Sequence, residues 1–263
     1  MSLQLNYRLF SAESNSNFTP IIILHGLFGS SKNWITHSRE LSMLGYPVYT
    51  VDQRNHGDSP WSDEHSVQAM TIDIIQLQDQ VIQGPAIYLG HSMGGLVAMS
   101  VALRMPNLVK GLIVADIAPK AYTSHHQLEF AALHVDVGSM KTRQEVEQAM
   151  ALIHPNQSVR QFLQMNLERT DTAFRWKVNV DALEKAEYLN EFESMLAASP
   201  KPYAGTALFL KGSRSPYIQE ADFQLIQNWF PKAAIHTLDA DHWLHYTAYN
   251  DFMNQVKTFL NQF

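Results

Sequence analysis

One serine lies in a sequence pattern that suits covalent catalysis. Residues 90–94 read Gly-His-Ser-Met-Gly, with Ser92 at the centre. A β-prone run at 86–89 precedes this pattern and a helix-like run at 96–103 follows it. A strand, a G-x-S-x-G turn and a helix form a nucleophile elbow, a strained turn that requires glycine on both sides of the serine. The Ser92 hydroxyl is therefore the predicted reacting group, and the alternative is a chance Gly/Ser turn.

A serine hydroxyl needs a base that removes its proton and a carboxylate that orients the base. In elbow-type hydrolases the chain order is serine, acid, histidine. Three histidines lie after residue 202, in the last part of the chain: His236, His242 and His245. His236 lies inside an expected strand and is interpreted as structural, whereas His242 follows that strand in a loop. His242 is the predicted base, and His245 is the alternative.

The acid is harder to place. Such enzymes usually carry it after the strand that is expected here at 207–210, but Ser215 stands at that position. Asp116 directly follows the preceding apolar run. Because neighbouring parallel strands lie only about 4.8 Å apart, an aspartate at either strand tip can reach the same histidine. Asp116 is the predicted acid, unless it only caps a chain junction. The other candidate acids are Asp222 and Asp239.

Two backbone N–H groups must bind the oxyanion that forms when the serine attacks a carbonyl. Met93 directly follows the serine at a helix N-terminus, where the helix dipole favours negative charge. The second donor is expected in the loop 25–30, His-Gly-Leu-Phe-Gly-Ser, whose glycines let the backbone approach substrate. Leu27, after His-Gly, is the predicted residue. This loop lacks the Gly-Lys-[Ser/Thr] ending of a phosphate-binding loop.

Alternating strand and helix patterns position these groups. The segment 3–10 alternates like an exposed edge strand, and the other runs are continuously apolar, as in strands buried on both faces. Strand–helix alternation predicts an α/β fold with a mostly parallel sheet covered by helices. The other expected strands are 21–24, 48–51, 87–89, 112–115, 207–210 and 234–238, and expected helices include 70–81 and 251–259.

The alternation stops between residues 119 and 202. This segment shows helical periodicity and no convincing strand, which predicts a helical cap, or lid, over the carboxyl ends of the strands, where open α/β sheets bind ligands. The expected core is residues 1–118 and 203–263. Candidate pocket residues are His25, Phe28, His91 and Trp176, and further cap aromatics are Phe130, Phe162, Phe174 and Tyr188.

Composition limits the class of protein. The chain has 263 residues, 46% of them hydrophobic, enough for one large α/β domain. The net charge of −6, without a Lys/Arg run, makes nucleic acid an unexpected partner. The lack of cysteine excludes disulfides, thiol catalysis and Cys-ligated zinc. No signal-peptide pattern or membrane-spanning apolar run is present, so a cytoplasmic protein without cofactor or metal is expected.

Several motifs together resemble the α/β-hydrolase superfamily and, within it, the YbfF-type bacterial esterases. The resemblance implies the α/β-hydrolase fold, hydrolysis of carboxylic esters and acyl thioesters, a triad acid at Asp116 and a serine, Ser215, near the triad. The chain departs from the group at Asp241, where glycine is usual, and at 247–249, where acidic and proline residues are usual. The motifs are His25-Gly26, Arg54-Asn55-His56-Gly57, Gly90 to Gly95, Asp116 to Pro119, Trp176 to Asn179, Ser215 to Tyr217, and His242-Trp243.

The predicted function is therefore that of a serine hydrolase acting on a small-molecule acyl ester or thioester. Ser92 attacks the acyl carbonyl, His242 transfers the proton, Asp116 orients His242, and water releases the acid. The same triad would also suit a lyase, a C–C bond hydrolase or a cofactor-free haloperoxidase, because fold and triad do not separate these reactions. A non-catalytic ligand-binding protein is the other alternative. The sequence leaves the acyl group and the oligomeric state open.

Overall fold

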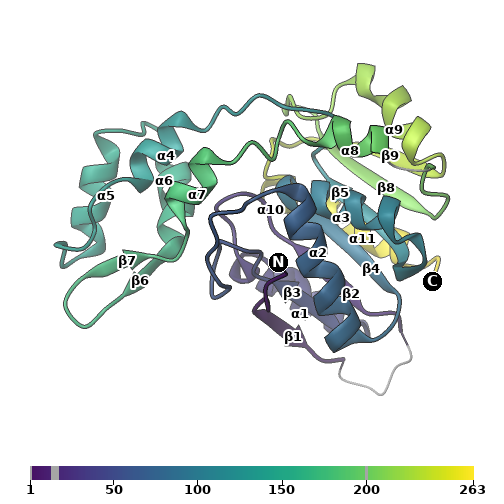
Figure 1. Ribbon diagram of the computed structural model, residues 1–263, viewed down its shortest axis with the longest axis horizontal. Coiled ribbons are helices and arrows are strands. Elements are labelled where there is room, and N and C mark those ends of the chain that lie inside the picture. Colours follow the sequence, from purple (N-terminus) through teal and green to yellow (C-terminus); the bar gives the residue numbers. More distant parts are fainter. Residues whose placement is uncertain (1, 13–17, 199–200) are drawn as a thin grey trace.

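A seven-stranded sheet forms the centre of the computed structural model, which describes residues 2–12, 18–198 and 201–263. The strand order is β1-β3-β2-β4-β5-β8-β9, and only β1 runs antiparallel to its neighbour. The predicted α/β fold with a mostly parallel sheet is thus confirmed (Figure 1). The strands are β1 (Tyr7–Phe10), β2 (Ile21–Leu24), β3 (Val48–Val51), β4 (Ala86–His91), β5 (Val109–Ala115), β8 (Ala207–Gly212) and β9 (Ala233–Leu238).

The first strand is shorter than the alternation over 3–10 predicts. The Leu3 N–H donates to Asp73 Oδ1 at 2.6 Å, and the Asn6 N–H donates to the Ser59 hydroxyl at 2.8 Å. These residues therefore pair with side chains, and only the part from Tyr7 onward pairs with β3.

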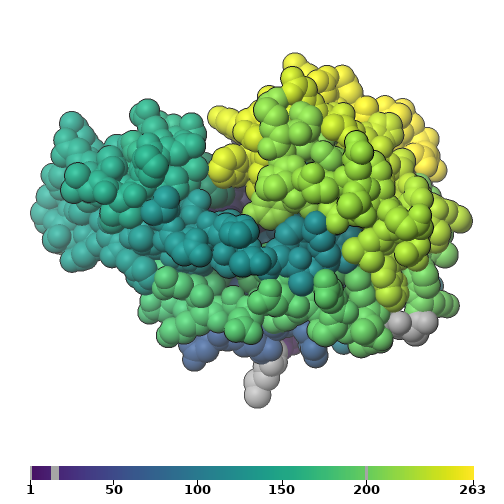
Figure 2. Space-filling view, turned by 90° about the horizontal axis from the view of Figure 1, so that it is seen from above, coloured from purple at the N-terminus to yellow at the C-terminus, as the bar shows by residue number. Residues whose placement is uncertain are grey.

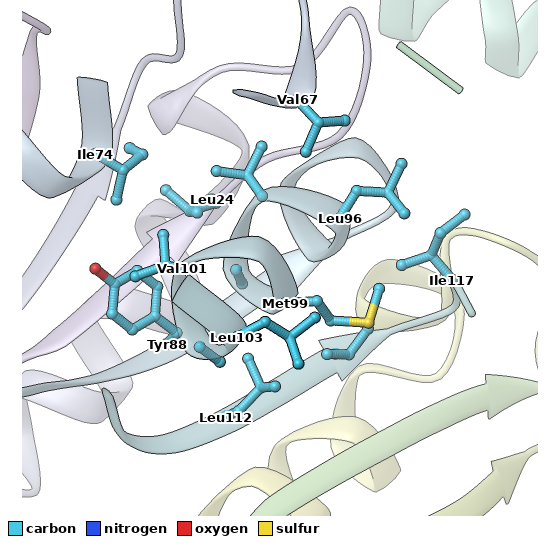
Figure 3. Packing of buried hydrophobic residues seen from close by; sticks show 14 of the residues in the cluster. Leu24, Val67, Ile74, Tyr88, Leu96, Met99, Val101, Leu103, Leu112 and Ile117 are labelled. Atoms are coloured by element: carbon cyan, nitrogen blue, oxygen red, sulfur yellow. The ribbon is translucent and has the colours of Figure 1, made fainter. Parts of the chain in front are cut away.

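Both faces of the sheet are covered, as continuously apolar strands require. Ile22 and Leu24 of β2 join one apolar cluster, and Ile21 and Ile23 join the other. Figure 3 shows Leu96 and other side chains of α3 packed in the first cluster. Helices α2 (Val67–Leu77), α3 (Met93–Arg104) and α9 (Phe223–Trp229) cover the first face, and α1 (Ile35–Met43), α10 (Leu244–Thr247) and α11 (Tyr249–Leu260) cover the second.

The helix predicted at 70–81 begins three residues earlier, at Val67, and its last turn is π-helical. The Ser66 hydroxyl accepts the Ala69 N–H at 3.0 Å and starts α2 at Val67. The chain continues into a π-helical turn, Gln78–Ile82, and ends at Gln83 in a left-handed conformation with φ of 58°. The predicted helix 251–259 corresponds to α11.

The structure describes 119–198 and 201–202 of the segment 119–202, and residues 199–200 lie outside the described residues. Most of the regular structure in this segment is helical, but the prediction that it contains no strand is wrong. Strands β6 (Leu167–Arg169) and β7 (Phe174–Trp176) form an antiparallel hairpin closed by Thr170, whose N–H donates to the Ala173 carbonyl at 3.0 Å. Three-residue strands are too short to show a period of two. The helices are α4 (Gln127–Leu133), α5 (Arg143–Ala151), α6 (Gln157–Leu163), α7 (Val180–Lys185) and α8 (Phe192–Ala198).

Packing divides this segment in two. Side chains between Phe130 and Leu183 form a separate apolar cluster, which also takes in Phe28 from the loop after β2. Residues from Tyr188 to Leu196 instead pack into the cluster on the first face of the sheet. The separate lobe in Figure 1 is therefore smaller than the expected cap 119–202. Within the described ranges, no helix is long and apolar enough to cross a membrane.

Candidate active site

Ser92 lies on a strained turn between β4 and α3. Its backbone has φ of 51° and ψ of −120°, a rarely populated conformation for a residue with a side chain. A Cβ on Gly90 would lie 2.3 Å from the Gly94 carbonyl oxygen, and one on Gly94 would lie 2.3 Å from the Leu24 oxygen. Both flanking glycines are therefore needed for space, and the turn has the geometry predicted from the sequence.

His242 lies beside Asp116, as the sequence predicts. The distance from His242 Nδ1 to Asp116 Oδ2 is 2.8 Å. Asp116 follows β5, is fully buried and has φ of 54°. The Gly212 N–H donates to Asp116 Oδ1 at 2.9 Å, and the Ser215 hydroxyl donates to Oδ2. Donors from the next strand and its loop thus hold the carboxylate toward the imidazole.

The alternative acids are bound elsewhere. Both Asp222 carboxylate oxygens accept hydrogen bonds from Lys120 Nζ, at 2.8 and 2.7 Å. The Asp239 carboxylate pairs with Arg214 and its side chain is 87% exposed. Asp241, the departure from the family pattern, accepts the Trp243 N–H at 2.9 Å and the Thr247 hydroxyl at 3.1 Å. Of these carboxylates and that of Asp116, only that of Asp116 is hydrogen-bonded to His242.

The other nearby histidines are held in structural positions. His245 is buried, stacks on Trp34 with ring centroids 4.5 Å apart, and has its pKa lowered well below the usual value by burial. His91 Nε2–H donates to the His242 carbonyl at 2.8 Å, and burial also lowers the pKa of His91. His236 lies on β9 and is exposed. These environments leave His242 as the candidate base.

The loop after β2, which contains the predicted donor Leu27, is bonded to His56 through the next residue. The Phe28 N–H donates to His56 Nε2 at 3.2 Å, and His56 Nδ1–H donates to the Arg54 carbonyl at 2.9 Å. In the part of the chain that the structure describes, neither the Leu27 nor the Met93 N–H donates to another protein group. Within the described residues, the N–H groups of both predicted oxyanion donors therefore lack a protein acceptor.

His25 has a structural position in the same loop. Its Nδ1–H donates to the Gly26 carbonyl at 2.8 Å, and its Nε2 accepts the Gln53 N–H at 3.0 Å. Burial lowers the pKa of His25. Although the ring lines the cavity described next, both its nitrogens are already occupied.

A cavity of about 390 Å³ lies at the carboxyl ends of the strands and is lined by both Ser92 and His242. Figure 2 shows the teal part of segment 119–202, called the insertion from here on, beside the C-terminal residues (yellow), with a recess between them. The predicted pocket residues His25, Phe28 and His91 line the cavity. In its described part, the insertion lines the cavity with eight residues, of which only Phe162 is a candidate from the sequence: Tyr122, Thr123, His125, His126, Glu129, Val159, Phe162 and Leu163.

Trp176 does not belong to this cavity, and its assignment to the pocket is wrong. It lies on β7, where its Nε1–H donates to the Val135 carbonyl at 3.3 Å. It lines a separate depression together with Trp61 and Lys177. The remaining cap aromatics pack in apolar clusters, Phe130 and Phe174 in that of the insertion and Tyr188 against the sheet.

Sequence reasoning gave no role to three side chains that lie at the site. Tyr217 stacks on the His242 ring, and Tyr122 donates from its hydroxyl to the Tyr217 carbonyl at 2.7 Å. Glu129 lies in the cavity wall. The motif Ser215 to Tyr217 contained a signal for the first of these, but nothing in the local sequence marks the other two.

Comparison with known proteins shows the family of this chain. The model of the alpha/beta hydrolase fold family matches residues 19–249. An sn-1-specific diacylglycerol lipase from Danio rerio is 38% identical, over 98% of this chain and 83% of its own. Esterase YbfF from Escherichia coli is 30% identical, over 98% of this chain and 100% of its own.

A solved structure of a marine microorganism esterase superposes with a TM-score of 0.89 at 38% identity, covering 98% of this chain and 100% of that one. The fold, the family match and these relatives agree along nearly the whole chain. The protein therefore belongs to the α/β-hydrolase family, with esterases and lipases among its relatives.

Proposed function

We propose that this protein is a serine hydrolase that cleaves carboxylic esters, and acyl thioesters, through an acyl-enzyme on Ser92. The observation that carries the proposal is the 2.8 Å contact between His242 Nδ1 and Asp116 Oδ2, since His242 lines the same cavity as Ser92. The strained backbone of Ser92 adds support, since strain of this kind is concentrated at functional positions.

In the proposed reaction, His242 Nε2 takes the Ser92 hydroxyl proton while the oxygen attacks the acyl carbonyl. Asp116 holds the imidazole in the required tautomer and stabilises the imidazolium. The N–H groups of Leu27 and Met93 bind the oxyanion, and the N-terminus of α3 favours its negative charge. The imidazolium then protonates the leaving alcohol or thiol, and water attacks the acyl-enzyme by the same steps to release the acid.

The cavity wall suggests how the acyl group is held. Val159, Phe162 and Leu163 of the insertion face the same space as Ser92. Apolar walls distinguish acyl chains by roughly 1–3 kcal/mol per methylene-sized change. We infer that the insertion acts as a lid that sets acyl-chain length, and that a cavity of about 390 Å³ favours short to medium chains.

Labelling and turnover test this function. Wild-type protein should react with a fluorophosphonate at Ser92 and hydrolyse nitrophenyl acetate, butyrate or octanoate, with acyl-CoA thioesters assayed in parallel. Ser92→Ala should abolish labelling and lower kcat by roughly 10⁴- to 10⁶-fold. His242→Ala should be about as severe, whereas His245→Ala should keep most of the activity.

The matched control is Ser158→Ala, because Ser158 is exposed on α6. It should label and turn over like the wild type. Wild-type activity in Ser92→Ala, or labelling of another residue, would contradict the proposal.

A further inference from the structure

Among the described residues, the lining of the cavity contains an acidic residue without a lysine or arginine beside it. In the portion of the chain that the structure describes, the residues that line the cavity include Glu129 and no lysine or arginine. We propose that Glu129 is a specificity-determining residue that makes the site select neutral esters over esters bearing an anionic group on the acyl or alcohol part. This inference rests on the proposed function, because it concerns the substrate of the same site.

The neighbouring His154 leaves the Glu129 charge in place. His154 Nε2 lies 3.5 Å from Glu129 Oε1, while its Nδ1 accepts the Asn156 N–H at 3.2 Å. An Nδ1 that accepts a hydrogen bond carries no proton, so the proton is on Nε2 and the imidazole is neutral. His154 therefore orients the carboxylate by a polar contact without cancelling its charge.

The buried imidazoles around the cavity do not supply a compensating cation. Burial lowers the pKa of His25, His91, His126 and His245, so these rings stay neutral near pH 7. His125 also lines the cavity and is exposed to solvent, which screens its interactions.

The negative potential extends to the reacting end of the cavity. Burial is the main cause of the raised pKa of Tyr217, and the charges of Asp116 and Glu129 raise it further. Tyr217 stacks on His242, so the Glu129 field is felt beside the catalytic imidazole. The Asp116 charge is offset when His242 becomes an imidazolium. No lysine or arginine among the described residues that line the cavity offsets the Glu129 charge in this way, so this charge remains to repel an anionic substrate.

The expected effect follows from Coulomb's law. Two like charges about 7 Å apart, in a dielectric between those of a protein surface and water, change a rate constant by about 5- to 50-fold. The Glu129 side chain is 22% exposed, which favours the lower part of that range.

A pair of esters matched in shape tests the proposal. Ethyl 5-oxohexanoate and monoethyl glutarate differ only in that a terminal methyl ketone replaces a carboxylate. The measured quantity is the ratio of kcat/KM for the neutral ester to that for the anionic ester. The wild type should favour the neutral ester, and Glu129→Gln, which keeps the shape and removes the charge, should lower the ratio about 5- to 10-fold.

The control is Glu193→Gln, which makes the same charge change at an exposed position on α8 and should leave the ratio unchanged. A measurement on unmodified protein complements the variants, in case Glu129→Gln folds poorly. Raising the salt from about 0.02 to 0.5 M should reduce the wild-type ratio severalfold, because salt screens a charge effect and not a shape effect.

Two results would overturn the inference, and they are distinguishable. A wild-type ratio near one, or an equal ratio in wild type and Glu129→Gln, removes the specificity role while ester turnover upholds the proposed function. Failure of the wild type to hydrolyse any ester removes the proposed function and this inference with it.

Discussion

Tyr217 covers one face of the His242 imidazole, with ring centroids 4.0 Å apart and planes inclined by 23°. Asp116 approaches the edge of the same ring, at Nδ1. A charge partner in the ring plane and an aromatic face above it both favour a positive imidazole. In the proposed reaction the imidazolium exists only after proton transfer, so both contacts act on the intermediate and its transition states more than on the resting enzyme.

Replacing Tyr217 should therefore lower the rate of the chemical step more than substrate binding. We expect Tyr217→Leu to reduce kcat for a nitrophenyl ester by about 10-fold, in line with the strength of a cation–π contact, with a smaller change in KM. Tyr217→Phe keeps the ring and should retain most of kcat. Equal losses in the two variants would assign the effect to the hydroxyl group and contradict the stacking argument.

The carboxylate of Asp116 should matter far more than the hydroxyl of Ser215, which donates to it. Asp116→Asn preserves the shape but favours the wrong imidazole tautomer, so we expect kcat to fall by up to about 10⁴-fold. Ser215→Ala should cost much less, because a hydroxyl supports the carboxylate without balancing charge. The controls Asp222→Asn and Asp239→Asn should stay active, and an inactive control beside an active Asp116→Asn would refute the assignment.

Two aromatic residues of the insertion should separate substrate preference from stability. Phe162 lines the cavity, and its ring centroid lies 6.0 Å from that of Trp243, so Phe162→Ala should shift activity toward longer acyl chains.

Trp176 packs on the apolar cluster of the insertion outside the cavity, so Trp176→Ala should lower the melting temperature and leave the acyl preference unchanged. Kinetics on esters of increasing acyl-chain length and thermal unfolding check both variants. A changed acyl preference in Trp176→Ala, with none in Phe162→Ala, would contradict the positions of these residues relative to the cavity.

Stability should fall below neutral pH because several histidines are buried in the neutral form. Burial lowers the pKa of His65 from 6.5 to about 3 and also lowers those of His56, His91 and His245. The unfolded chain binds protons near pH 6.5 whereas these folded imidazoles do not, so stability is full above pH 6.5 and is lost as the pH falls.

Urea unfolding at pH 7.5, 6.5 and 5.5 measures this dependence. Each such histidine contributes about 1 kcal/mol of loss between pH 6.5 and 5.5. His65→Gln should therefore lose about 1 kcal/mol less than the wild type over that interval, whatever its absolute stability. An identical pH dependence in the two proteins would show that folding leaves the pKa of His65 unchanged, and would contradict this prediction.

The local sequence determined the elbow and the sheet. Only glycine fits at 90 and 94, and continuously apolar runs between helices are typical of strands buried on both faces of a sheet. Both features could therefore be predicted without knowledge of any distant contact. The position of Asp116 beside His242 also followed, because the carboxyl ends of adjacent parallel strands meet at one edge of the sheet. In each case the deciding interaction is either local or repeated regularly along a strand.

The tertiary structure alone decided which side chains surround these groups. Trp34, on a distant part of the chain, stacks on His245, whereas His242 is hydrogen-bonded to Asp116. The hairpin β6–β7 turns Trp176 away from the cavity, while α4 places Glu129 in its wall. Such contacts join segments far apart in sequence, and the packing of the whole insertion sets their direction, so no local periodicity records them.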